Sequence, residues 1–250
     1  MKKEHSFLLI ITLWVLSFSL FAQTAAEEIK FYSAHFPPYT YEVGAKKGGA
    51  MYEISNEIIR RLELKTKIEF VPWPRARYEA ETKKNVIIIP LARTPEREEH
   101  YSWLIHALDD PYVILAHKFT TFDISSIEAT KKLRIGILKG SVADSLLKRL
   151  GYTNLDFSSN DLQNVRKLNL KRLDAWVAPL SAINQYKEQV GLGKDDLRVG
   201  YEFTILKEYI GASKHFDKEM AQKWSKTFEE MKKDGSYQAI MKKYGMTPLP

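Results

Sequence analysis

The feature that most constrains the fold is a regular alternation of short strand-like and longer helix-like segments. Residues 29–33 alternate between apolar and polar side chains, as in a half-buried strand. Residues 51–62 carry apolar side chains at the spacing of one helical face. A short strand at 68–70, a helix over 74–84 and an apolar strand at 85–91 follow. This β-α-β-α-β order predicts a parallel sheet that is covered on both faces.

A second unit of the same kind begins near residue 133. The pattern predicts strands at 133–137, near Leu155, at 174–177 and at 197–203, with helices between them and a helical tail to the C-terminus. Two such units in one chain indicate two α/β lobes that face a cleft. Ligands of open α/β sheets bind beyond the carboxyl ends of the strands. We therefore expect the loops after residues 33, 90 and 137 to border the cleft.

The N-terminus has the pattern of a secretory signal peptide. Lys2 and Lys3 precede a nearly continuous apolar run over 7–22, and small residues follow it. This predicts a signal peptide over 1–26 that is cleaved within 22–26, with an uncleaved anchor as the alternative. The chain has no cysteine, which excludes a lipoprotein and disulfides. We expect a bacterial periplasmic protein.

Charge and motifs exclude several classes of function. The formal net charge is +7, but basic and acidic residues are interspersed, which argues against a nucleic-acid partner. The six histidines form no His-Glu-x-x-His motif, and neither Gly-x-Ser-x-Gly nor a phosphate-binding Gly-rich loop occurs. We therefore expect no enzyme, no metal and no cofactor, although His35 could face the cleft.

The stretch IIIPLARTPERE (87–98) places two arginines, Arg93 and Arg97, just beyond a buried strand. One interpretation is an ordinary solvated loop. The other is that a guanidinium meets an anionic ligand, because its planar fork of donors fits a carboxylate.

Several stretches, in this order, resemble the bacterial extracellular solute-binding proteins of family 3, which feed polar amino acids to ABC importers. They are FPPYTYE, GGAMYEISNEIIRRL, RTPEREEHYSWL, DDPYVIL, IGILKGSVADSLL, KRLDAWVAP and MKKDGSYQAIMKKYG. The resemblance covers nearly all of residues 28–245. VPWPRARYE (71–79) is similar to a branch of the family with Pro-Trp-x-Arg after the second strand.

The resemblance implies a type II-like, two-lobe periplasmic-binding-protein fold, with two doubly wound sheets joined by a two-strand hinge. Lobe 1 would comprise 27–114 and 206–250, and lobe 2 would comprise 115–205. The function implied is capture of a small polar, carboxylate-bearing solute between the lobes of a monomer. The solute would pass to an ABC permease in the inner membrane. The alternatives are a stand-alone periplasmic sensor and a dehydratase-like enzyme on the same fold.

The resemblance also assigns site residues. Arg97 matches the arginine that holds the ligand carboxylate, and Thr94 adds a donor beside it. Ser141, at a helix start, matches the hydroxyl of the second lobe that meets the same carboxylate. From the residue types themselves, Trp73, Arg75 and Tyr39 are candidates for the wall of the site. Trp176 is expected in the core, and Arg93 in solvent or at the rim.

Three positions depart from the pattern of the family's amino-acid binders. Pro90 and Ala92 stand where hydroxyl side chains hold the carboxylate, and Pro179 stands where an acidic residue holds the α-amino group. With two or three arginines and no obvious acidic partner, these departures favour an anionic ligand such as a dicarboxylate over a standard α-amino acid.

Overall fold

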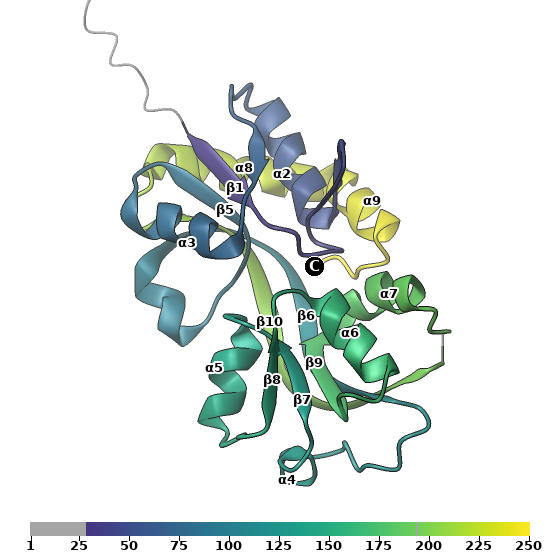
Figure 1. Ribbon diagram of the computed structural model, residues 1–250. Helices are drawn as coiled ribbons and strands as arrows, with labels where there is room; N and C mark the ends of the chain where they lie inside the picture. Colours follow the sequence, from purple (N-terminus) through teal and green to yellow (C-terminus); the bar gives the residue numbers. More distant parts are fainter. Residues whose placement is uncertain (1–28, 194) are drawn as a thin grey trace, which may run out of the picture.

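The structure, a computed structural model, describes residues 29–193 and 195–250. The predicted signal peptide lies outside these residues. Two α/β lobes share one eight-stranded sheet of order β4-β1-β5-β10-β6-β9-β7-β8. Figure 1 shows lobe 1 above lobe 2, with β6 and β10 running between them. The predicted α/β class and two-lobe arrangement are confirmed. Within the described residues, no helix is long and apolar enough to cross a membrane.

Lobe 1 is built around three parallel strands. The strand β1 (Lys30–Ser33) lies between β4 (Ile68–Phe70) and β5 (Val86–Ala92). Its helices are α2 (Ala50–Arg61), α3 (Trp73–Thr82), α8 (Lys218–Lys233) and α9 (Ser236–Lys243). A small hairpin of β2 (Tyr41–Val43) and β3 (Lys46–Gly48) precedes α2, where the sequence predicted only a loop.

Lobe 2 repeats the pattern. Its strands are β7 (Ile135–Leu138), β8 (Leu155–Ser158) and β9 (Ala175–Pro179), and β7 is parallel to both others. Its helices are α4 (Ile127–Thr130), α5 (Val142–Arg149), α6 (Asp161–Asn169), α7 (Leu180–Lys187) and the 3-10 turn η2 (Glu188–Val190). Trp176 is fully buried in this lobe, which confirms its predicted place in the core.

Two long antiparallel strands join the lobes. They are β6 (Tyr101–His117), which follows the 3-10 helix η1 (Pro95–His100), and β10 (Leu197–Ser213). In lobe 1 β10 pairs with β5, and in lobe 2 β6 pairs with β9. The lobe boundaries predicted at 114/115 and 205/206 fall inside these strands. The strand predicted at 197–203 is only the first part of β10.

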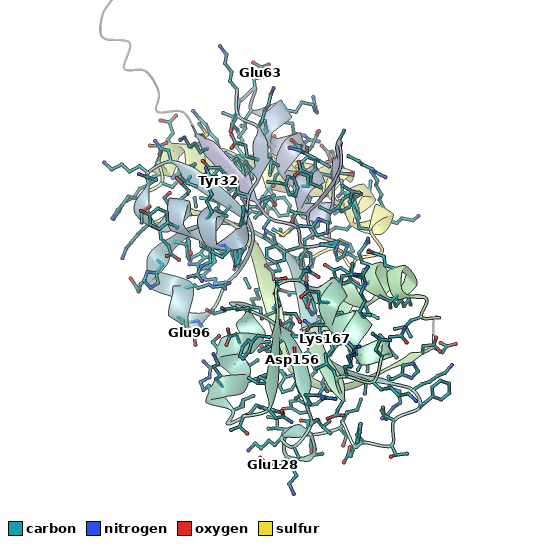
Figure 2. The ribbon with its side chains drawn as sticks, viewed as in Figure 1. Tyr32, Glu63, Glu96, Glu128, Asp156 and Lys167 are labelled. Atoms are coloured by element: carbon teal, nitrogen blue, oxygen red, sulfur yellow. The ribbon has the colours of Figure 1, made fainter. Side chains whose placement is uncertain are left out.

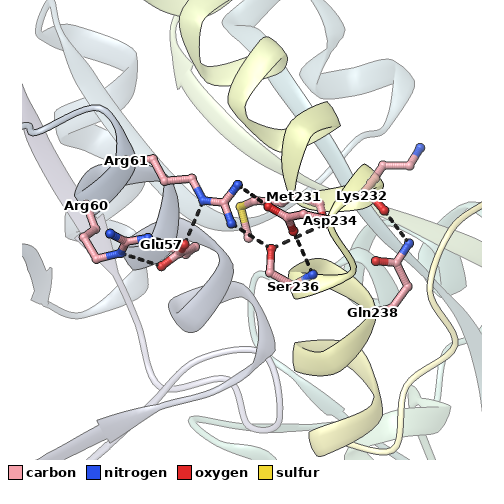
Figure 3. Close-up of polar contacts among 8 residues, drawn as sticks. All are labelled: Glu57, Arg60, Arg61, Met231, Lys232, Asp234, Ser236 and Gln238. Atoms are coloured by element: carbon pink, nitrogen blue, oxygen red, sulfur yellow. Dashed lines mark hydrogen bonds and ion pairs between the residues drawn. The ribbon is translucent and has the colours of Figure 1, made fainter.

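The chain returns to lobe 1 after β10, and polar contacts fix it there (Figure 3). Arg61 of α2 forms an ion pair with Asp234, with Nη1 2.7 Å from Oδ2, and donates a hydrogen bond of 3.0 Å to Ser236 Oγ. Trp224 and Phe228 of α8 are buried in the same core as α2. The C-terminal helices thus complete the core of lobe 1.

Candidate functional site

A cavity of about 80 Å³ lies between the two lobes. Side chains from both lobes and from the crossing strands line it. They are Phe36, Tyr39, Trp73, Pro90, Ala92, Arg97, Tyr112, Leu138, Ser141, Val142, Asp161, Pro179, Leu206 and Glu208. The cavity is bordered by the segments that follow β1, β5 and β7, which are the strand ends singled out from the sequence.

Two wider grooves open on either side of this cavity. One, of about 890 Å³, shares Phe36, Trp73 and Leu138 with the cavity and adds further aromatic side chains, Phe70 and Tyr186. The other, of about 460 Å³, shares Arg97 and Ser141 and is lined mainly by polar residues. A solute held in the cavity can therefore extend into a largely apolar groove or into a polar one.

Arg97 reaches the cavity from η1. Its Nη1 donates a hydrogen bond of 3.1 Å to the carbonyl of Ala92, which orients the guanidinium at the end of β5. Burial, reinforced by the nearby charge of Arg77, lowers the pKa of Arg97. No carboxylate of the described residues forms an ion pair with it. A half-buried guanidinium with unused donors is the arrangement that receives a carboxylate.

Arg93 behaves differently, although it lies only four residues away. It is exposed, its Nη2 lies 2.5 Å from Glu98 Oε1, and its guanidinium covers the rings of Trp103 and Tyr209. Because its charge is already compensated at the surface, it is not available to a solute in the cavity.

The two predicted hydroxyl residues line the same polar groove as Arg97. Ser141 is the N-cap residue of α5, but its side chain does not cap the helix, and its buried Oγ makes no well-formed hydrogen bond. It sits close to the hydroxyl of Tyr112, whose pKa is raised mainly by burial. Thr94 lines the polar groove with Arg97, and its carbonyl accepts a hydrogen bond of 3.0 Å from the Arg97 amide.

The wall candidates divide into two that line the cavity and one that does not. Tyr39 is 4% exposed, and its hydroxyl donates to Asp110 Oδ2 over 2.5 Å. Trp73 meets Phe36 edge to face, with ring centroids 5.3 Å apart, and the two rings form one side of the cavity. Arg75 is exposed on α3 and is not among the lining residues.

Acidic side chains that sequence reasoning missed also reach the cavity. Glu208 of β10 is 4% exposed, and burial raises its pKa to about 8. Asp161 begins α6, where its Oδ1 accepts hydrogen bonds from Trp176 Nε1 at 3.0 Å and Asn164 Nδ2 at 3.2 Å. Burial raises the pKa of Asp161 as well. One guanidinium and two carboxyl groups therefore line the same small cavity.

This arrangement differs from the sequence expectation of several arginines without acidic partners. Of Arg75, Arg93 and Arg97, only the last lines the cavity. Pro90, Ala92 and Pro179 line it too, so the departures noted in the sequence fall at the site itself. The acidic groups come instead from β10 and from the start of α6. The Glu42 and Glu53 side chains pair with Lys47 and Lys243, respectively.

Because Glu208 is buried, the free energy of unfolding of the protein should depend on pH, and the direction of this dependence follows from its pKa. In the unfolded chain a glutamate loses its proton near about pH 4.3, whereas in the folded protein its pKa is about 8. Between these values the folded state holds one more proton, so the free energy of unfolding falls as pH rises, by up to about 1.4 kcal/mol per pH unit.

We expect Glu208→Gln to remove this contribution. Chemical denaturation of both proteins at about pH 5 and about pH 8 should show that the variant gains stability relative to the wild type as pH rises, by a few kcal/mol. His35, Asp110 and Asp161 titrate in both proteins, so their contributions largely cancel in the comparison. Parallel pH profiles of the two proteins would show that Glu208 is ionised in the folded state throughout.

At the rim of the cleft an ion pair joins the two lobes directly. Glu96 of η1, labelled in Figure 2 at the lower end of lobe 1, has its Oε1 2.5 Å from Arg149 Nη1 of α5. Both side chains are half or more exposed, so this ion pair contributes little to stability. It shows that the lobes meet at this edge. Within the described residues, no group of three or more acidic or histidine side chains could hold a metal ion.

Two lobes on a pair of crossing strands, with a largely apolar cavity between them that also holds a few charged side chains, are the architecture of a protein that binds a small molecule. A family model confirms this class. Residues 30–247 match the bacterial extracellular solute-binding proteins, family 3, and the chain belongs to that family. No curated protein sequence matches the chain.

Solved structures share the fold. A histidine kinase sensor domain with similarity to periplasmic binding proteins has a TM-score of 0.78 at 14% identity, covering 87% of this chain and 96% of the other. An ancestral arginine-binding protein bound to arginine has a TM-score of 0.75 at 21% identity, covering 87% and 97%. The ancestral amino acid-binding protein AncCDT-1, a precursor of cyclohexadienyl dehydratase, has a TM-score of 0.75 at 17% identity, covering 87% and 94%.

Proposed function

We propose that this protein is a periplasmic solute-binding protein that captures a small polar solute bearing a carboxylate and delivers it to an ABC importer. The observation that carries the proposal is Arg97, a half-buried guanidinium that faces the cavity and makes no ion pair with any residue that the structure describes. Buried charges are normally paired, because an unpaired charge away from water is costly. A carboxylate on the solute supplies the missing partner.

The other groups of the cavity support the same placement. The hydroxyl of Ser141 is buried at the start of α5, on the lobe 2 side of the cavity, and it has no well-formed hydrogen bond. A carboxylate between Arg97 and Ser141 would contact both lobes at once. Such a solute stabilises the form in which the lobes meet, and β6 and β10 are the segments on which hinge closure occurs.

Two other functions remain as outcomes of the test. The similarity to a kinase sensor domain favours ligand sensing as the second candidate, with the same binding step but a receptor as the partner. Catalysis is the third, because Glu208 is buried beside the cavity and its pKa of about 8 is that of a general acid. We propose binding without turnover, by a monomer that acts without a cofactor.

The experiment is a thermal-shift screen of the protein without residues 1–26 against amino acids, dicarboxylates, polyamines and small aromatic acids. A probe present at about 100 times its dissociation constant stabilises the protein by about 2.7 kcal/mol, which raises the melting temperature by several degrees. NMR of the probe after overnight incubation tests for turnover. The proposal predicts shifts by carboxylates and unchanged probes. Shifts only by compounds without a carboxylate would contradict it.

A further inference from the structure

Glu208 lies on the floor of the cavity, where the crossing strands join the lobes. In β10 it pairs in register with Ala92 of β5 and with Leu108 of β6. Its side chain is 4% exposed and lines the cavity, and Oε2 finds no hydrogen-bond partner among residues 29–193 and 195–250. A buried carboxyl oxygen without a donor is unfavourable. Its position therefore indicates a donor that the described part of the chain does not supply.

The neighbours of Glu208 do not satisfy it. Arg97 lies on the same cavity and attracts the carboxylate electrostatically, but the two side chains form no ion pair or hydrogen bond. Asp110 repels it from the next inward position of β6. Asp110 itself is satisfied, because it accepts hydrogen bonds from the Tyr39 hydroxyl and from the amide of Ser181 at 3.2 Å.

Asp161 places a second carboxyl group on the cavity, from lobe 2. Its two hydrogen bonds, from Trp176 and Asn164, both end on Oδ1. The cavity therefore carries more acidic than basic side chains among its described lining residues. A solute with only a negative charge would meet Arg97 at one end and two carboxyl groups elsewhere, whereas a solute that also carries a cation compensates both.

We propose that Glu208 is the specificity-determining residue for a positively charged nitrogen on the solute, with Asp161 beside it. This rests on the proposed function, because the solute's carboxylate must occupy Arg97 for its cation to face β10. It also gives the site an acidic group in spite of Pro179, from a different element of the fold. The cation donates N–H bonds to the Glu208 carboxylate, which is the partner that Oε2 lacks.

The binding step has a proton balance that can be measured. In the empty protein burial keeps the Glu208 carboxyl protonated at neutral pH, since its pKa is about 8. A cation against it favours the carboxylate, so the proton leaves Glu208 for the buffer as the solute binds. Near about pH 6.5 we expect release approaching one proton per solute, seen as a calorimetric enthalpy that depends on the ionisation enthalpy of the buffer.

The test uses pairs of probes that differ only in the amino group: L-phenylalanine with 3-phenylpropionate, and L-glutamate with glutarate. The proposal predicts that the amino acid of a pair binds the wild type with proton release. Glu208→Gln should lower its affinity at least about tenfold and abolish the proton release. The same variant should leave the affinity for the deaminated probe unchanged or raise it. Glu202→Gln, an exposed position on the same strand, is the matched control and should change none of these values.

The outcomes separate this inference from the proposed function. If the deaminated probes bind and the amino acids do not, or if Glu208→Gln leaves amino-acid affinity and proton release intact, the role of Glu208 is wrong and carboxylate capture stands. If no probe binds and the wider screen is also negative, the proposed function fails, and the inference fails with it. The variant should fold, because it removes a buried ionisable group, and its denaturation profile verifies this before titration.

Discussion

Arg97→Ala should weaken the binding of any carboxylate probe from the screen by at least about 30-fold, because truncating one partner of a buried charge pair costs about 2–5 kcal/mol. The loss should appear in titration calorimetry as a higher dissociation constant. It should arise mainly from a faster dissociation rate. The empty protein should lose at most about 1 kcal/mol of stability, since the substitution removes a hydrogen bond to Ala92 but no ion pair with any described residue.

Two further variants test whether the loss of affinity is specific to the Arg97 guanidinium. Arg93→Ala removes an arginine from the same loop, but one whose charge is compensated at the surface by Glu98, and it should leave affinity within a few-fold. Arg97→Lys keeps the charge and loses the planar fork, so it should recover only part of the affinity. Equal losses in Arg93→Ala and Arg97→Ala would indicate a general effect of charge and not a contact with the solute.

Gly49→Ala should give the largest loss of stability, about 2–4 kcal/mol, or roughly 5–15 °C in melting temperature. Gly49 has φ 116 and ψ 155, a region that is accessible essentially only to glycine. A Cβ there would lie 2.2 Å from the carbonyl oxygen of Tyr39. That oxygen accepts hydrogen bonds from Met51 at 2.9 Å and Tyr52 at 3.2 Å, so it cannot move without disturbing the start of α2.

The same substitution should also reduce binding, because Tyr39 lines the cavity. Gly44→Ala is the control, since Gly44 has φ 59 but an added Cβ would meet nothing within 4 Å. It should cost about 1 kcal/mol and leave affinity unchanged. Urea denaturation of the three proteins measures the differences. A loss no larger for Gly49→Ala than for Gly44→Ala would show that the Tyr39 loop can move away from the new Cβ.

Periodic patterns predicted most of the fold. The apolar run at 85–91 corresponds to β5, and the helical spacing over 51–62 corresponds to α2. A strand that is buried on both faces gives a continuous apolar run, and a helix that is buried on one face gives a regular apolar spacing, so both are easily recognised in a sequence. The hairpin β2–β3 was missed, since three-residue strands leave too short a pattern. The extent of β10 was also missed, because a strand that runs through two lobes changes the face it buries along its length.

The candidate site was predicted only in part. Arg97, Ser141, Tyr39 and Trp73 reach the cavity. Ser141 and Trp73 stand at the start of a helix, and Arg97 and Tyr39 lie in segments that follow a buried strand, which are places that a sequence pattern can locate. Arg75 lies outside, because the turn of α3 that presents it could not be derived from the sequence.

The sequence around Glu208 does contain a pattern that indicates its position. Leu206, Glu208 and Ile210 alternate with Lys207 and Tyr209, so the glutamate occupies an inward position of a strand. A charged residue in such a position indicates a buried polar site. Asp161 could not be found in this way, because an aspartate at the start of a helix is ordinary.

The most direct test of the central claim is a crystal structure of the protein with the screen probe that binds most tightly. The account predicts that the probe occupies the cavity between the lobes, with its carboxylate within hydrogen-bond distance of the Arg97 guanidinium and the Ser141 hydroxyl. A probe found outside this cavity, or bound in it with its carboxylate turned away from Arg97, would contradict the account.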